Sequence, residues 1–359
     1  MSDASDALDR IEKFRKSRKA HPVVTDKRIT MSHGSGGKAT HQLIEAMLLP
    51  ALSNPLLDAL EDQAVFQVDS GRLAFTTDSY VVDPIFFPGG DIGMLAVNGT
   101  VNDLATCGAD PLYLSLALIL EEGLEMDVLR KIVDSVAEAA RLAGVSVVTG
   151  DTKVVPRGKA DKLYINTAGV GVLRMPVSLS IGNARPGDSV LMSGPIGDHG
   201  IAVMAARGGL ELDLDTESDS APIHHMVQAV LHAAKEVRCF KDPTRGGVAS
   251  SLNEIASRSG VCIAIDELAV PVRAEVRGAC EILGIDPLYM ANEGRLLCVV
   301  PRHFEDAALD AMRGLELGVG ACRIGEVLPE PSGMVFVRTQ IGGTRVLDML
   351  TGDPLPRIC

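Results

Sequence analysis

Runs of residues typical of β-strands alternate with runs typical of α-helices along most of this sequence, and this alternation restricts the possible folds more than any other feature. In the first half, LAFTT (73–77), LYLSLALIL (112–120) and VSVVT (145–149) are typical of strands. Apolar residues recur at helical spacing between Leu129 and Ala140. Such alternation is expected where helices pack on a sheet, so the sequence predicts an α/β fold.

The second half repeats this alternation after a turn at Arg185-Pro186-Gly187-Asp188. A chain of 359 residues is long enough for roughly two domains. We therefore predict two α/β domains with a boundary near this turn. The predicted segments are an N-terminal extension (1–27), an N-terminal domain (28–180), a C-terminal domain (181–344) and an extended, mobile tail (345–359).

Composition and charge argue against several classes of function. Acidic residues outnumber basic ones by 47 to 34, and the net charge of −13 would repel a polyanion, so we expect no nucleic-acid partner. The longest apolar run, 112–120, is far shorter than the ~20 residues of a membrane-spanning helix, so we expect no membrane contact. The seven cysteines include no CxxC pair and the N-terminus lacks the apolar stretch of a secretory signal, which predicts a cytoplasmic chain with reduced thiols.

A glycine-dense run, HGSGGK (33–38), could bind phosphate because small residues allow several backbone N–H groups to converge on an anion. Gly36, Gly37 and Lys38 are its candidate binding residues. The run is not a Walker A loop, since Ala39 stands where Ser or Thr is required, and it is not a Rossmann fingerprint. A flexible surface loop is the alternative interpretation.

Four aspartates stand where strand-like runs end or glycine-rich helical runs begin. They are Asp78, Asp103, Asp151 and Asp242. Ligands of open α/β sheets gather at such strand ends, and Mg²⁺ prefers carboxylate and phosphate oxygens. Aspartates from separate segments could therefore hold a nucleotide through a metal ion, although any one of them alone is better explained as a cap or a solvated turn.

Three further polar residues are candidates for the same site. Asn98 lies one helical turn before Asn102 in an otherwise apolar stretch, and buried amides need partners. Those partners could be a nucleotide or a local polar network. Lys153 follows Asp151 by two residues, and Glu293 precedes the strand-like run RLLCVV (295–300); on spacing alone each could be an ordinary surface residue.

Cys359 is the last residue and follows Pro354 and Pro356, which disfavour a helix and favour an extended chain. A tail of about 15 residues can span up to ~50 Å. We expect such a thiol to be exposed and able to reach both an active site and another protein. It is not a prenylation signal, because the cysteine is last instead of fourth from the end. The possible roles are a covalent substrate carrier, a metal ligand or a mixed disulfide.

Eight short motifs occur in order along the chain: HGSGGK (33–38), TTDSYVVDP (76–84), FFPGGDIG (86–93), NGTVNDLA (98–105), GDTKVV (150–155), KDPTRGG (241–247), ANEG (291–294) and PRIC (356–359). Together they closely resemble the HypE family of hydrogenase maturation factors over residues 30–359. This resemblance implies a PurM-like two-domain α/β (α+β) fold, whose N-terminal domain forms a β-barrel across a homodimer. ATP would then bind in the groove between the domains.

The same resemblance implies an activity and partners. A carbamoyl group carried on Cys359 would be dehydrated with ATP to a thiocyanate, which donates the cyanide ligand of the nickel–iron hydrogenase iron. The implied partners are the carbamoyltransferase HypF, which loads the carbamoyl group, and the HypC–HypD complex, which accepts the cyanide.

The resemblance also implies roles for the candidate residues, with ATP and Mg²⁺ as cofactors. Mg²⁺ would bind Asp78, Asp103 and Asp242. Glu293 would be the base that removes nitrogen protons, and Lys153 would stabilise negative charge on the reacting oxygens. The nucleotide would be bound by Gly36, Gly37, Lys38, Asp78, Asn98, Asp103, Asp151 and Asp242.

Two other functions are consistent with these residues. The chain could be a PurM-like kinase or synthetase that acts on a diffusible small molecule, with the tail uninvolved. It could also be a non-catalytic scaffold or metallochaperone that binds a nucleotide as a switch and a metal through Cys359.

Overall fold

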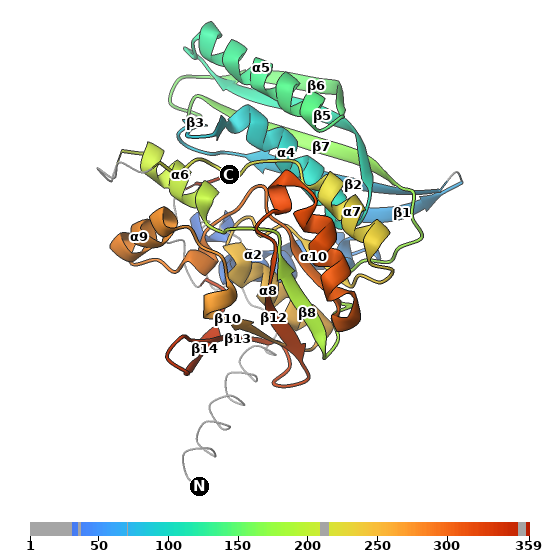
Figure 1. The fold of residues 1–359 in the computed structure, drawn as a ribbon. Helices are drawn as coiled ribbons and strands as arrows, with labels where there is room; N and C mark the ends of the chain where they lie inside the picture. Colours follow the sequence, from blue (N-terminus) through green and yellow to red (C-terminus); the bar gives the residue numbers. More distant parts are fainter. Residues whose placement is uncertain (1–30, 35–36, 70, 209–214, 351–356) are drawn as a thin grey trace.

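A five-stranded sheet with helices on one face organises the N-terminal half of the chain (Figure 1). The computed structural model describes residues 31–34, 37–69, 71–208, 215–350 and 357–359. Within this sheet only β5 and β6 run parallel. In spatial order its strands are β1 (Ala64–Val68), β2 (Gly71–Tyr80), β7 (Leu163–Leu173), β5 (Asp110–Glu121) and β6 (Ser146–Val155).

The two faces of this sheet differ in what covers them. Helices α4 (Ile92–Thr106) and α5 (Met126–Leu142) pack against each other, and α4 packs on β2, β5 and β7. Burial alternates along β7 residue by residue, as expected for a strand with one covered face. On the opposite face, Phe75 and Tyr113 lie in register with Val170, and both aromatic side chains are exposed. We call this the open face of the sheet.

A seven-stranded sheet organises the C-terminal half. In spatial order its strands are β14 (Thr344–Leu347), β13 (Met334–Arg338), β10 (Cys262–Asp266), β12 (Cys322–Leu328), β8 (Asp188–Met192), β11 (Leu297–Pro301) and β9 (Cys239–Lys241). The neighbouring strands β8 and β11 are buried at every residue, and therefore on both faces. This requires covering helices on both sides.

Helices supply that cover. On one face of the sheet, α7 (His224–Ala233) and α10 (Glu305–Arg313) contribute to the hydrophobic core. On the other face, α8 (Gly247–Ser259) contributes to a second core. Two more helices, α6 (Asp198–Ala206) and α9 (Ala274–Leu283), pack against each other on the side facing the first sheet. Besides short 3-10 helices, the other elements are α2 (Lys38–Leu43), a π-helix (Ile44–Leu48), α3 (Leu49–Leu52), β3 (Phe86–Phe87) and β4 (Gly90–Asp91).

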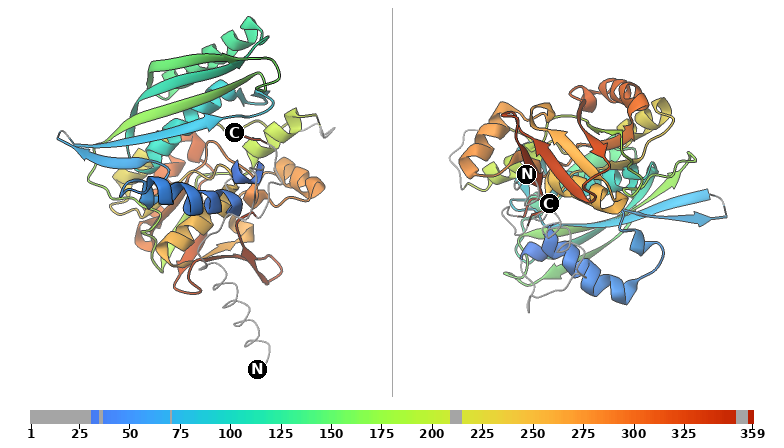
Figure 2. Two further views of the ribbon diagram at one scale, coloured as in Figure 1. Left: turned by 180° about the vertical axis from the view of Figure 1, so that it is seen from behind. Right: turned by 90° about the horizontal axis from the view of Figure 1, so that it is seen from below.

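The two halves meet at a shared apolar cluster. Tyr80 and Ile92 of the N-terminal half contribute to it, together with Ile201 and Val276 of the C-terminal half. The last two residues, Ile358 and Cys359, belong to the same cluster. Figures 1 and 2 accordingly show the C-terminus between the two halves.

Most of the predicted strands and helices are present. LAFTT lies in β2, LYLSLALIL in β5, VSVVT overlaps β6, and the helical spacing from Leu129 lies in α5. β14 spans the predicted start of the tail at residue 345, so part of that segment belongs to the second sheet. The predicted N-terminal extension and residues 351–356 of the tail lie outside the described residues. In the part of the chain that is described, no helix is long and apolar enough to cross a bilayer.

Candidate active site

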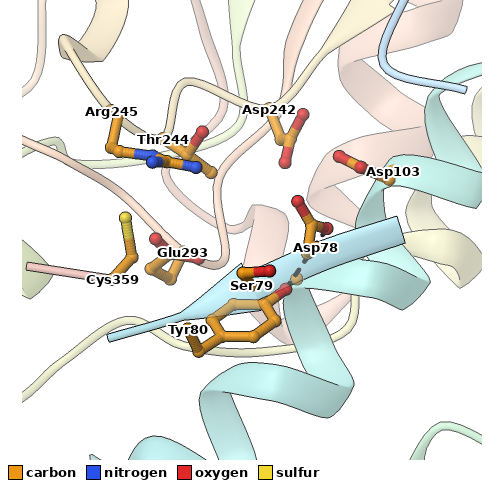
Figure 3. Close-up of a pocket in the computed structure, with 10 residues that line it drawn as sticks. Asp78, Ser79, Tyr80, Asp103, Asp242, Thr244, Arg245, Glu293 and Cys359 are labelled. Atoms are coloured by element: carbon orange, nitrogen blue, oxygen red, sulfur yellow. Dashed lines mark hydrogen bonds between the residues drawn. The ribbon is translucent and has the colours of Figure 1, made fainter. Parts of the chain in front are cut away.

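An acidic pocket lies where the two halves of the chain meet, and Figure 3 shows the side chains that line it. About 340 Å³ of empty space lies within it, partly open to solvent. Five of the predicted site residues lie together here: Asp78, Asp103, Asp242, Glu293 and Cys359. The full lining is Asp78, Ser79 and Tyr80 of β2, Gly99 and Asp103 of α4, Asp242, Thr244 and Arg245 before α8, Glu293 before β11, and Cys359.

Three carboxylates at this pocket are close enough to share one cation. Oxygen atoms of Asp62, Asp103 and Asp242 all lie within 4.8 Å of one another. Burial and the neighbouring charges of Asp78 and Asp242 hold the pKa of Asp103 well above its usual range. Burial, with Asp62 as the next cause, raises the pKa of Asp242 to about 7. Crowded negative charge and hard oxygen donors fit Mg²⁺.

Asp78 adjoins this group. Burial raises the pKa of the Asp78 carboxyl, and a hydrogen bond with Asp103 opposes that shift. The Tyr80 hydroxyl lies 3.4 Å from Asp78 Oδ2. The predicted metal set of Asp78, Asp103 and Asp242 stays a prediction, and the structure adds Asp62 as a candidate ligand.

Glu293 is fixed through its backbone. Its N–H donates to Asp219 Oδ1 at 3.0 Å, and its carbonyl oxygen accepts from Asn102 Nδ2 at 3.1 Å. Its side chain is buried, and Oε1 has no hydrogen-bond partner among the described residues. Burial, followed by the charges of Asp242 and Asp219, holds the pKa of Glu293 well above its usual range. A carboxyl group with a high proton affinity therefore faces the pocket.

Cys359 is buried, with 7% of its surface exposed, so the expectation of an exposed thiol is wrong for this structure. The reason is non-local: the backbone of the last residues is hydrogen-bonded to α6, and Ile358 fills a place in the shared apolar cluster. Burial raises the pKa of the thiol to about 12, and the Arg245 guanidinium opposes that shift. The sulfur is therefore a neutral thiol that lines the pocket.

Asn98 and Asn102 project from α4 toward the same loop. Asn98 Nδ2 donates to Ser220 Oγ at 3.1 Å, while its Oδ1 is buried without a partner among the described residues. Asn102 makes three bonds to backbone groups, accepting from the Ile223 N–H at 2.9 Å and donating to the carbonyls of Ala221 and Glu293. Asn102 therefore belongs to a local polar network. Asn98 keeps an acceptor available and stays a predicted nucleotide ligand.

The glycine-rich run lies outside the lining of this pocket. Gly36 is outside the described residues. Gly37 precedes α2, and a Cβ atom there would lie 2.7 Å from the backbone oxygen of Leu350. Lys38 donates from its backbone N–H to that oxygen, and its Nζ lies 2.7 Å from Asp348 Oδ2. Phosphate binding by this run stays a prediction, and in the structure the run contacts the beginning of the tail.

Asp151 and Lys153 also lie outside the pocket lining. Both are exposed on β6, where the Lys153 Nζ lies 2.9 Å from Asp151 Oδ2. They are in register with Ala117 and Ile119 of β5, which places them on the open face of the sheet. Their predicted roles remain untested, and within one copy of the chain they lie on the face of the sheet opposite α4.

Sequence reasoning missed two residues of this site. Asp62 precedes β1, a strand that no sequence pattern predicted, so nothing indicated that its carboxylate lay beside those of Asp103 and Asp242. Arg245 lies inside the KDPTRGG motif, which was singled out only for Asp242. The signal that could have indicated Arg245 was its position, three residues after the candidate metal ligand Asp242.

Comparison with known proteins identifies both halves. Residues 60–173 match the N-terminal domain model of AIR synthase related proteins, and residues 185–338 match the C-terminal domain model. A protein of Cupriavidus necator named carbamoyl dehydratase HypE is 51% identical over 333 residues, which cover 92% of this chain and 95% of that relative. These findings confirm the predicted PurM-like two-domain fold, whereas a β-barrel across a dimer stays a prediction.

Solved structures agree with this assignment. The crystal structure of a HypE–HypF complex is similar with a TM-score of 0.82 and 47% identity, covering 86% of this chain and 99% of that one. A crystal structure of HypE in complex with ATP is similar with a TM-score of 0.78 and 48% identity, covering 92% of this chain and 100% of that one. The chain described here therefore belongs to the carbamoyl dehydratase HypE family.

Proposed function

We propose that this chain is an ATP-dependent carbamoyl dehydratase that acts on its own last residue. The carbamoyl group on the Cys359 sulfur would lose water to become a thiocyanate, and its cyanide would pass to the iron of a nickel–iron hydrogenase during maturation. The observation that carries the proposal is the position of Cys359 in the pocket, which Glu293 and Arg245 also line. The names of the relatives and the ATP-bound HypE structure support it.

The proposed chemistry solves a leaving-group problem. An amide oxygen leaves poorly, whereas phosphate leaves readily. The carbamoyl oxygen attacks the γ-phosphorus of ATP, and the bond to ADP breaks. The carbon–oxygen bond then breaks with loss of phosphate, while the nitrogen gives up both protons and forms the triple bond. S-carbamoyl-cysteine and ATP thus give S-cyanocysteine, ADP and phosphate.

Acidic residues of the pocket are suited to the nucleotide. Mg²⁺ held by Asp62, Asp103 and Asp242 would supply positive charge to the phosphates, with Asp78 beside it. Asn98 offers a buried amide oxygen with no partner among the described residues, which can accept a hydrogen bond from the nucleotide or from metal-bound water.

Two residues are suited to the carbamoyl group itself. Glu293 takes protons from its nitrogen, because burial raises the pKa of this carboxylate and makes it a stronger base than a surface glutamate. Arg245 carries a positive charge close enough to Cys359 to lower the pKa of the thiol. The same charge can stabilise negative charge that develops on the carbamoyl oxygen.

The proposed partners follow from the family. The HypE–HypF complex supports HypF as a partner, and its role as the carbamoyl donor is proposed on the family resemblance. The HypC–HypD complex is the proposed acceptor of the cyanide, on the family resemblance alone.

A homodimer is also proposed, on the properties of the open face. An apolar row of Phe75, Val170 and Tyr113 crosses three strands there with both aromatic side chains exposed, and β6 is a long edge strand with exposed side chains. Apolar faces and unpaired edges of this kind are normally covered by another surface. A second copy packed on this face would also contact Lys153. The role proposed for Lys153 at the reacting oxygens requires this exposed side chain to be buried at an active site.

Replacement of Cys359 by serine tests the proposed function directly. Carbamoylated wild-type chain treated with ATP and Mg²⁺ should lose one water from its C-terminal peptide, as measured by mass spectrometry. Cys359→Ser should yield no such product while it binds ATP with wild-type affinity. Product formation from an added small molecule by the serine variant would instead indicate a kinase or synthetase.

A further inference from the structure

The last three residues are held by side chains that the proposed chemistry does not use. His199 Nε2 lies 2.9 Å from the backbone oxygen of Ile358, and this contact is fully buried. Arg207 Nη2 donates to the backbone oxygen of Arg357 at 2.8 Å. Both side chains come from α6 and its C-cap, where α6 faces the N-terminal half. Two successive carbonyl groups of the tail are therefore bound by one helix.

Burial lowers the pKa of His199 and so favours a neutral imidazole, whose tautomer follows from its two partners. A carbonyl oxygen can only accept, so Nε2 carries the hydrogen and donates it to Ile358. Nδ1 then accepts from the hydroxyl of Ser218, 2.8 Å away. Ser218 is fixed in turn, because its own N–H donates to the Pro88 oxygen and its Oγ accepts from the Ser220 N–H. Ser218 thus holds the imidazole in the tautomer that binds the tail.

Side chains of the tail are held as well. Arg357 Nη2 lies 2.5 Å from Asp161 Oδ2 and 3.9 Å from Asp83 Oδ2, both in the N-terminal half. Arg207 also donates through Nε to the backbone oxygen of Asp83. The Ile358 side chain is 6% exposed, in the apolar cluster shared by the two halves. The side chains of Arg357 and Ile358 therefore each have their own binding site.

We infer that His199 and Arg207 form a clasp for the C-terminal Arg357-Ile358-Cys359 peptide and set the position of the Cys359 sulfur in the pocket. The inference rests on the proposed function for its catalytic consequence. His199 and Arg207 bind the backbone oxygens of Ile358 and Arg357, which are chemically the same in every state of the cysteine. The clasp therefore binds the free, carbamoylated and cyanated tail alike, and discrimination between these states is left to residues of the pocket such as Glu293 and Arg245.

The test measures docking separately from catalysis. Full-length chain with a free Cys359 is treated with iodoacetamide, and the alkylation rate of the C-terminal peptide is followed by mass spectrometry. His199→Ala and Arg207→Ala should each raise this rate by roughly tenfold, as loss of one buried hydrogen bond typically does. His199→Gln can donate to Ile358 and accept from Ser218, so it should return most of the protection. His232→Ala, on the exposed side of α7, is the matched control and should react at the wild-type rate.

The same variants are then carbamoylated and followed through a single turnover with ATP. Dehydration at saturating ATP should slow by a similar factor in His199→Ala and Arg207→Ala, with the KM for ATP unchanged, and His199→Gln should be restored. Release of the last residues by a carboxypeptidase should be faster in the alanine variants whether or not the thiol is carbamoylated. Thermal unfolding of each variant identifies any that fails to fold.

The possible outcomes separate this inference from the proposed function. Alkylation and carboxypeptidase release at wild-type rates in folded His199→Ala and Arg207→Ala would overturn the clasp, whatever the activity of the wild-type chain. A second outcome is that the wild-type chain forms no thiocyanate, while the alanine variants lose protection against alkylation and His199→Gln keeps it. The dehydratase proposal then fails and the clasp stands. Equal loss of protection in the glutamine and alanine variants would also contradict the assigned hydrogen bonds.

Discussion

At the scale of single residues, Asp242 should make the stability of the metal-free chain depend on pH. Burial and its neighbour Asp62 raise its pKa from 3.8 to about 7. Between these two values the folded chain holds a proton that the unfolded chain has released. The free energy of unfolding should therefore fall as pH rises through this window, by up to about 1.4 kcal/mol per pH unit for one proton.

Thermal unfolding with and without Mg²⁺ measures this effect. Without metal, the Tm of the wild-type chain should decrease from about pH 5 to pH 7 relative to that of Asp242→Asn, which has no proton to release. Mg²⁺ should raise the wild-type Tm more at the higher pH, because it competes with protons for the carboxylates. Asp127→Asn, on the exposed face of α5, serves as the control. Parallel pH profiles for wild type and Asp242→Asn would contradict this account of the cluster.

At the scale of elements, α4 connects the sheet of one half to the active-site loop of the other. It begins at Asp91, whose side chain accepts from the N–H groups of Gly93 and Met94, and most of its residues are buried. Through Asn102 it binds three backbone groups of the C-terminal half, at Ile223, Ala221 and Glu293. Asn102→Ala should lower the free energy of unfolding by about 2–4 kcal/mol, since it leaves buried backbone groups without partners.

Urea unfolding gives the measurement, with Asn98→Ala as a matched variant on the same helix. Asn98 donates to one side chain, Ser220, so its loss should cost only about 1 kcal/mol. Equal stability of the two variants would show that the bonds of Asn102 do not hold the halves together.

Long elements of this fold could be predicted from the sequence, and short or non-local features could not. The run LYLSLALIL (112–120) predicted β5 (Asp110–Glu121) to within two residues at each end, because an apolar run of that length has few other interpretations. The three-residue β9 is too short to show a period, and it precedes Asp242. Strand order, the contribution of Asp62 and the burial of Cys359 all depend on contacts between distant segments, which local patterns do not contain.

At the scale of the whole molecule, a single charged substitution on the open face can test whether two copies of the chain associate there. The chain has a mass of 37.9 kDa, and analytical ultracentrifugation of the wild type should give about twice that value if the proposed homodimer forms. Phe75→Glu places a charge in the exposed apolar row and should give the mass of one chain. Met126→Glu, a similar change on the exposed end of α5, should leave the dimer intact. A wild-type chain sedimenting as a single copy would refute this assembly.

The inclusion of Ile358 and Cys359 in the cluster between the halves has a consequence for delivery. Both residues belong to the interior of the molecule, and Cys359 is also the proposed carrier of the cargo. The proposed transfer to another protein requires the tail to leave, and its departure would remove apolar contacts between the halves and expose a hollow to water. A protein that fills that hollow while it receives the cargo would favour departure of the tail. Contacts between the two halves would be weakest during the transfer.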